Sequence, residues 1–146
     1  MIRFLCAVIM GLYATSVTAQ QVQDCDWIAR ADAIVEPWKD NTRTFANGNV
    51  RLALLDTVEP AAAAFHILVL SPPYGELGER QCKTIGVQQN IGFPGVDFKS
   101  LEAAYHPSIG LVFELKLQVF DGSNFDPGQL QFSLNQSTGE IVIFDQ

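Results

Sequence analysis

The sequence predicts a small α+β domain dominated by an antiparallel β meander, with one N-terminal helix packed on it. Two observations predict this class. Apolar residues in 24–38 recur at helical spacing, whereas the chain from residue 42 onwards consists of short β-rich runs separated by turn residues. The length of 146 residues suits one domain with one core. We therefore expect seven or eight strands, arranged as a sheet or a partly closed barrel.

The first 19 residues have the three parts of a secretory signal. Arg3 supplies a positive charge, 4–13 are apolar, and 17–19 are the small residues that precede a cleavage site. The apolar stretch is too short to span a bilayer. We expect a cleaved signal peptide over 1–19 and a single exported globular domain over 20–146, periplasmic or extracellular, without a stable membrane anchor.

Cleavage at this site leaves two cysteines, Cys25 and Cys82. They are too far apart for the Cys-x-x-Cys spacing of a catalytic thiol pair. Because an exported protein meets an oxidising environment, we predict that they form a structural disulfide. Its loop closure contributes about 4 kcal/mol in the chain-entropy estimate.

The predicted helix begins after Asp24, which is a suitable N-cap. Trp27, Ala31, Ile34 and Trp38 then recur at spacings of four, three and four, which places them on one helical face. Residues 20–23 are expected to be an irregular lead-in. A proline at position 37 is expected to end or distort the helix.

The first strands are predicted around an Asn-Gly turn. Runs 42–45 and 50–55 flank this dipeptide, which is a strong hairpin signal. Run 63–70 is apolar on both faces, so it is the candidate central strand. Residues 71–81 are rich in proline and glycine and are predicted to be a connection without regular structure, followed by a strand over 82–87.

The C-terminal half predicts a second series of hairpins. Residues 97–105 combine helical spacing with a following turn, and we favour a strand over a helix there. Apolar and polar residues alternate over 112–120 and over 130–134, which indicates strands with one buried face. A turn at 136–139 leads to a last strand over 140–144.

The formal net charge of −7 restricts the partners. An acidic chain repels phosphate backbones and anionic lipid head groups, so nucleic acid and membrane surfaces are poor candidates. Basic proteins, cationic peptides and divalent metals suit the charge better, although acidity also serves solubility alone.

No cofactor motif or catalytic residue set is recognisable. The chain has two histidines, of which His66 lies in an apolar strand and His106 precedes a proline in a turn. Each is explained by a structural role. A small hydrolase that uses His66 with nearby carboxylates, such as those of Glu102, Glu114 and Glu140, is the alternative function.

The segment 121–126 is rich in side-chain oxygens. Asp121, Asn124 and Asp126 could bind calcium, but the spacing departs from that of an EF-hand loop. The same residue types form ordinary surface turns. We therefore expect no metal and no other cofactor, with these three residues as the calcium alternative.

The candidate binding loop contains Pro72, Pro73 and Tyr74. A tyrosine held by prolines beside a disulfide loses little entropy on binding. Phe93 and Phe125 also occupy predicted turns and are candidates of the same kind. In each case the alternative is that the ring packs on the protein's own core.

These observations predict a non-enzymatic exported module that binds a protein or a small apolar ligand. It would bind through its loops or through the space between helix and sheet. A purely structural envelope protein without a ligand site is a further alternative.

Overall fold

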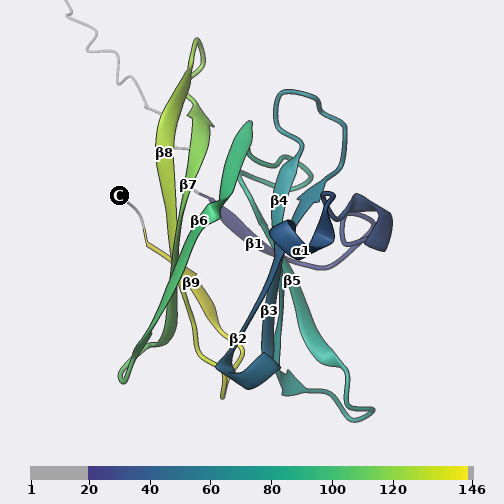
Figure 1. Ribbon diagram of the computed structural model, residues 1–146, viewed down its shortest axis with the longest axis vertical. Coiled ribbons are helices and arrows are strands. Elements are labelled where there is room, and N and C mark those ends of the chain that lie inside the picture. Colours follow the sequence, from purple (N-terminus) through teal and green to yellow (C-terminus); the bar gives the residue numbers. More distant parts are fainter. Residues whose placement is uncertain (1–19, 145–146) are drawn as a thin grey trace, which may run out of the picture.

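The computed structural model describes residues 20–144, which form two antiparallel β-sheets facing one another (Figure 1). The predicted signal peptide, 1–19, lies outside the described residues. One sheet has five strands and the other four, and they do not close into a barrel. The expected antiparallel β architecture is confirmed, but the single sheet or barrel of seven or eight strands is wrong. Apolar residues on both sets of strands bury one another between two layers instead.

The five-stranded sheet has the order β1-β5-β4-β3-β2. Its strands are β1 (Gln21–Asp24), β2 (Thr42–Phe45), β3 (Val50–Asp56), β4 (Phe65–Tyr74) and β5 (Arg80–Gly86). The predicted hairpin is confirmed, since Phe45 pairs with Val50, and Asn47 and Gly48 in its turn have positive φ angles of 55° and 86°. Strand β4 is central, as expected.

Two parts of this sheet differ from the sequence prediction. Strand β1 replaces the expected irregular lead-in, because Gln21 to Asp24 pair with the exposed edge of β5. Strand β4 continues through Tyr74, with a register shift between Ser71 and Tyr74 that accommodates the two prolines. The connection between β4 and β5 is therefore shorter than the predicted 71–81.

The four-stranded sheet is a meander in the order β6-β7-β8-β9. Its strands are β6 (Gly95–His106), β7 (Gly110–Phe120), β8 (Phe125–Leu134) and β9 (Ile141–Ile143). The strand favoured over 97–105 is confirmed. The alternation of β7 is confirmed too, because Phe113, Leu115 and Leu117 are buried whereas Glu114 and Lys116 are exposed.

The main core fills the space between the sheets. Phe113 and Phe132 stack at 5.0 Å, and Phe45 meets Phe113 edge-on at 5.0 Å. Leu52 and Val69 contribute from the five-stranded sheet. The two layers are also joined at one edge, where the Arg43 Nη1 atom of β2 donates a hydrogen bond to the Leu101 carbonyl of β6.

The predicted N-terminal helix over 24–38 is wrong. The described part of the chain has one short α-helix, α1 (Trp38–Asn41), and two short 3-10 helices, η1 (Ala31–Ala33) and η2 (Ala46–Gly48). Trp27 and Trp38, on the proposed apolar face, are 51% and 52% exposed. The Val35 N–H donates to the Leu54 carbonyl at 3.0 Å, so the chain there extends along the sheet rather than coiling.

Residues 25–36 nevertheless cover the outer face of the five-stranded sheet. Ile28 and Ala33 are buried against Leu55 and neighbouring apolar residues, which form a second, smaller core. The predicted disulfide between Cys25 and Cys82 is present and fastens this segment to β5. The role predicted for the helix, covering the sheet under a disulfide, is thus carried by an irregular segment.

Candidate functional site

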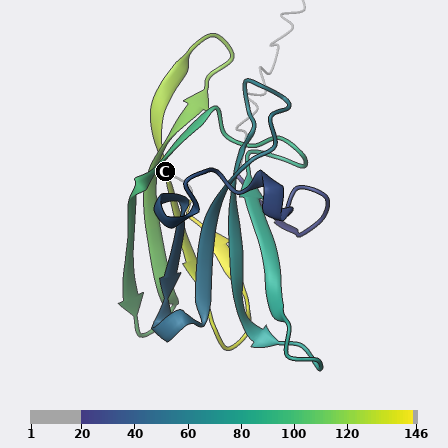
Figure 2. The same ribbon diagram turned by 45° about the vertical axis from the view of Figure 1, so that its right-hand side comes forward.

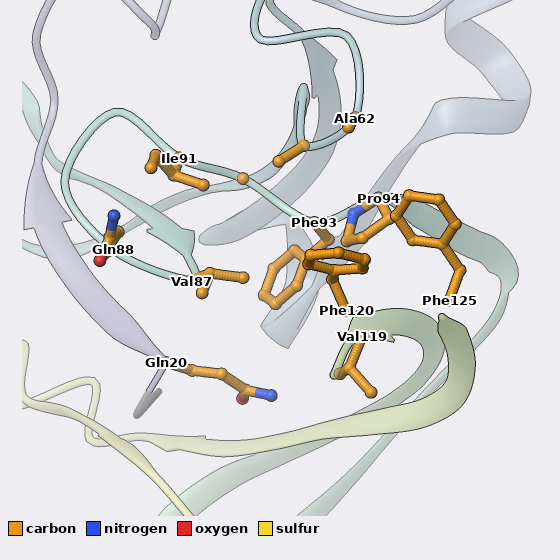
Figure 3. Close-up of a pocket in the computed structure, with 12 residues that line it drawn as sticks. Gln20, Ala62, Val87, Gln88, Ile91, Phe93, Pro94, Val119, Phe120 and Phe125 are labelled. Carbon is orange, nitrogen blue, oxygen red and sulfur yellow. The ribbon is translucent and has the colours of Figure 1, made fainter. Parts of the chain in front are cut away.

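An apolar pocket opens at one end of the sandwich, beside the hairpin that joins β7 to β8 (Figure 3). Its volume is about 260 Å³. Three separate parts of the chain build most of it: 62–63 before β4, 87–94 between β5 and β6, and 119–125 around the β7–β8 hairpin. The lining residues are Gln20, Ala62, Ala63, Val87, Gln88, Ile91, Gly92, Phe93, Pro94, Val119, Phe120 and Phe125.

The connection between β5 and β6 forms one wall of the pocket, and backbone hydrogen bonds hold it in place. The Val87 N–H donates to the Ile91 carbonyl at 2.9 Å, and the Ile91 N–H donates to the Gln88 carbonyl at 3.0 Å. The Gly92 N–H donates to the Ala63 carbonyl at 2.8 Å. These bonds satisfy the backbone of the connection, and most of the side chains that it contributes to the pocket are apolar.

Phe93 anchors this wall in the core. Its N–H donates to the Phe65 carbonyl at 2.7 Å, and the Phe65 N–H donates back to the Phe93 carbonyl at 3.2 Å. The Phe93 side chain is completely buried. Phe93 thus fixes this wall from behind, with its ring packed in the core between the sheets.

Phe120 and Phe125 form the outer side of the pocket. Their ring centroids are 5.1 Å apart, with the rings inclined at 39°, and both side chains are about half exposed. They pair across the β7–β8 hairpin, and Figure 3 shows Phe125 near Pro94 on the opposite wall. Exposed aromatic rings that border an apolar hollow are favourable contacts for an apolar ligand.

The pocket has the composition of a binding site for an apolar group. No charged residue lines it, and its polar side chains are those of Gln20 and Gln88. Apolar cavities smaller than this one bind small aromatic molecules, and sites for drug-sized ligands are somewhat larger. The pocket therefore fits one aromatic ring system or a short aliphatic chain.

The sequence singled out only part of this site. Phe93 and Phe125 are candidates on turns, and the structure brings both to one pocket, Phe93 buried and Phe125 half exposed. The remaining lining residues have no local motif, because the site combines segments more than 20 residues apart. Proximity of this kind depends on strand order.

His66 lies outside the pocket, on the outer face of the five-stranded sheet. It pairs with Leu55 across β3 and β4 and is 2% exposed. Its Nδ1 atom lies 3.2 Å from the Ala64 carbonyl, whereas Nε2 has no hydrogen-bond partner among residues 20–144. Burial lowers the pKa of His66 against smaller opposing effects of the Ala64 hydrogen bond and Asp26, which keeps the ring neutral at pH 7.

The connection after the candidate binding loop, between β4 and β5, lies at the opposite end of the sandwich from the β7–β8 hairpin, which borders the pocket (Figure 2). Pro72 is half-buried, whereas Pro73 and Tyr74 are exposed. The Tyr74 hydroxyl donates to the Asn49 Oδ1 atom at 3.1 Å, which connects this strand end to the turn between β2 and β3. Tyr74 is therefore held at the surface and does not fold into the core.

The calcium alternative falls on the tip of the β7–β8 hairpin. The Asp121 Oδ1 atom accepts hydrogen bonds from the backbone N–H groups of Ser123 at 2.7 Å and Asn124 at 2.6 Å. These bonds, that from Asn124 first, lower the pKa of Asp121. Asn124 and Asp126 lie in the same exposed hairpin. Within the described range, no group of three or more His, Cys, Asp or Glu side chains that could hold a metal gathers here or elsewhere.

The fold and pocket together define a class: a disulfide-linked, two-sheet antiparallel β protein with an apolar pocket at one end. No protein-family model, curated protein or solved structure matches the chain. Among residues 20–144, no helix has the length and apolarity needed to cross a bilayer.

Proposed function

We propose that this protein is an exported, non-enzymatic binding module that holds the apolar part of a small ligand in the end pocket. The observation that carries the proposal is the pairing of a buried aromatic wall, Phe93, with two half-exposed rings, Phe120 and Phe125, around an uncharged hollow. A ligand that displaced water from the half-exposed rings of Phe120 and Phe125 would gain about 25 cal/mol for each Å² of apolar surface buried.

The state of His66 supports binding over hydrolysis. A general base must reach the proton that it removes, either directly or through one water molecule. His66 is buried away from solvent, and its hydrogen bond within the described structure is to the Ala64 carbonyl. A structural envelope protein without a ligand site is less well supported because a pocket of about 260 Å³ is present.

The disulfide supports export, since such bonds persist in oxidising compartments. Export remains part of the proposal, and its periplasmic or extracellular destination stays open. N-terminal sequencing of the protein recovered outside the cytoplasm tests it. The expected first residue is Gln20, and an intact N-terminus at Met1 would reject cleavage.

The binding proposal is tested with N-phenyl-1-naphthylamine, an uncharged aromatic probe that fluoresces in apolar surroundings. We expect saturable binding at one site per chain. Ala62→Trp should abolish it, because Ala62 is an exposed lining residue and a large ring there would occupy the mouth. Ala104→Trp is the matched control, since Ala104 is an exposed residue near the far end of β6. Equal binding by both variants would overturn the proposal.

A second measurement searches for the natural ligand. Native and denaturing mass spectra of the same purified sample are compared, and extra mass that disappears on denaturation identifies a retained molecule. Wild-type protein should carry it, and the Ala62→Trp variant should not. A retained mass that survives in the variant would place the ligand elsewhere.

Tyr74 gives a second candidate function, the binding of a protein partner. The supporting observation is that the Asn49 hydrogen bond holds an exposed ring at the surface, which reduces the entropy lost on contact. Replacement of Pro72, Pro73 and Tyr74 by serine should remove a partner recovered from an envelope pull-down. Retention of every partner by that variant would reject this function.

A further inference from the structure

Positive side chains are missing from the three parts of the chain that build most of the pocket. The sequence has no Lys or Arg over 52–79, 84–98 or 117–146. These stretches contain the 62–63, 87–94 and 119–125 walls respectively. The Lys and Arg residues of the described structure all lie in other segments.

Carboxylates, in contrast, directly adjoin the pocket walls. Asp121 follows Phe120, and Asp126 follows Phe125. Asp126 is also the cross-strand partner of Val119, another lining residue. Both aspartates are exposed, so they remain hydrated and do not line the apolar interior.

These two carboxylates are available to a ligand. The ion pairs of the described residues, Arg30 with Asp32 and Lys83 with Asp24, lie on other elements. The amide hydrogen bonds from Asn124 and Ser123 lower the pKa of Asp121, which keeps it ionised at neutral pH. An incoming cation at this hairpin therefore meets two carboxylates that pair with no Lys or Arg side chain of the described residues.

We infer that the pocket prefers a cationic amphiphile: a ligand whose apolar part enters the pocket against the Phe120–Phe125 pair while an ammonium head group stays at the Asp121 and Asp126 carboxylates. This inference rests on the proposed function of the pocket. It adds a head-group selection in which fatty acids and other anionic amphiphiles are disfavoured by like-charge repulsion.

The test compares three amphiphiles that share an octyl tail: octyltrimethylammonium, octyl sulfate and uncharged octyl glucoside. Each amphiphile is titrated into a complex of N-phenyl-1-naphthylamine with the protein that begins at Gln20, and its affinity is measured from the loss of probe fluorescence. The protein is first treated with glutaminyl cyclase, which converts an N-terminal glutamine to uncharged pyroglutamate and so removes an α-ammonium group from the pocket wall. At low salt, we expect the cation to bind about tenfold more tightly than the anion, with the uncharged ligand between them. The difference should shrink as ionic strength rises.

Charge-neutral variants locate the preference. Asp121→Asn combined with Asp126→Asn should bring the three affinities within about twofold of one another, because asparagine can still accept the Ser123 and Asn124 N–H groups. Glu102→Gln combined with Glu114→Gln is the matched control. It removes two exposed, paired carboxylates from β6 and β7, away from the pocket lining, and should keep the preference.

The outcomes separate this inference from the function on which it rests. If neither the fluorescent probe nor any of the three amphiphiles binds, both proposals fail. If the probe binds but no amphiphile displaces it, the pocket function stands and the head-group inference is overturned. If all three bind with equal affinity and Ala62→Trp blocks them, the pocket function stands and the head-group inference is overturned. A cation preference that survives the two aspartate substitutions also overturns it, because the preference then arises elsewhere on the acidic surface.

Discussion

The imidazole ring of His66 lies so close to Gly92 that a Cβ atom at Gly92 would stand 2.8 Å from the His66 Cε1 atom. The same Cβ would lie 2.2 Å from the Phe65 carbonyl oxygen. His66 is on the outer face of the sheet, whereas Gly92 belongs to the pocket wall. A glycine is therefore required where the wall crosses behind the buried histidine.

Gly92→Ala should destabilise the protein by about 1–3 kcal/mol, the usual cost of overpacking a tight site. The Phe65 carbonyl is backbone and cannot move aside cheaply. Urea denaturation measures the change. Gly75→Ala is the control because the atoms nearest to the added Cβ belong to the flexible, exposed side chain of Glu79. Equal effects of the two substitutions would contradict this account of the wall.

His66 should make stability depend on pH. Its pKa is lowered from 6.5 by burial, so the unfolded chain binds a proton at a higher pH than the folded protein does. Stability from this group is complete above about pH 6.5 and falls as the pH drops towards the lowered pKa. Urea denaturation between about pH 7.5 and about pH 5 isolates the effect, since most carboxylates remain ionised there.

His66→Phe is the matched variant for this measurement, because it keeps an aromatic ring but does not titrate. The Ala64 carbonyl stays satisfied in the variant, since it also accepts hydrogen bonds from the Thr57 N–H at 3.0 Å and hydroxyl at 3.1 Å. The slope of stability against pH over this range should flatten. An unchanged slope would assign the dependence to another group.

The disulfide should stabilise the segment 25–36, which covers the outer face of the five-stranded sheet, more than it stabilises the core between the sheets. Replacing Cys25 and Cys82 by serine is expected to cost about 2–4 kcal/mol. Ile28 and Ala33 belong to a cluster separate from the inter-sheet core, so their segment should detach first. Limited trypsin digestion measures this as faster cleavage after Arg30, which is exposed.

Asp24→Asn is the control for the disulfide variant. It removes the Asp24–Lys83 ion pair, which joins the same two strands but involves an exposed carboxylate. Such a pair contributes about 0–1 kcal/mol. Cleavage after Arg30 that is no faster in the double serine variant than in Asp24→Asn would show that packing alone holds the segment.

Sequence patterns predicted those elements whose structure depends on residues close together in the chain. The Asn47-Gly48 turn fixes the β2–β3 hairpin, and alternation predicts the buried face of β7. The helix prediction was wrong because spacing alone cannot show that the Val35 N–H finds the Leu54 carbonyl. Cys25 and Cys82 could be paired by elimination, without any knowledge of the fold.

The pocket could not be predicted in the same way. Phe93 lies in the connection between β5 and β6, whereas Phe125 begins strand β8 of the four-stranded sheet. The arrangement of the strands in two layers brings the two residues to one pocket. The missing Lys and Arg residues were visible in the sequence as three separate gaps. In the fold, parts of these three stretches without Lys or Arg form the walls of one pocket.

Arg43 should stabilise the junction of the two sheets through a group that ordinary strand pairing leaves out. The β6–β7 register shifts between Asp97 and Glu102, so Leu101 lies in the irregular part of its strand. Its carbonyl accepts a hydrogen bond from the Arg43 Nη1 atom on the neighbouring sheet, while the Leu101 side chain is buried. A charged donor to a carbonyl in such a place contributes about 1.5–3 kcal/mol.

Arg43→Met should therefore lower the urea midpoint by an amount that corresponds to about 1.5–3 kcal/mol. The aliphatic stem stays, but the guanidinium that donates to Leu101 and lies 5.5 Å from the centre of the Phe45 ring is lost. Arg51→Met is the matched control: Arg51 is an exposed arginine on the adjacent strand β3, and its side chain has no recorded hydrogen bond or ion pair within residues 20–144. Its loss should change stability by less than about 0.5 kcal/mol. Similar losses for the two variants would mean that general charge effects, rather than the bond to Leu101, set the contribution of Arg43.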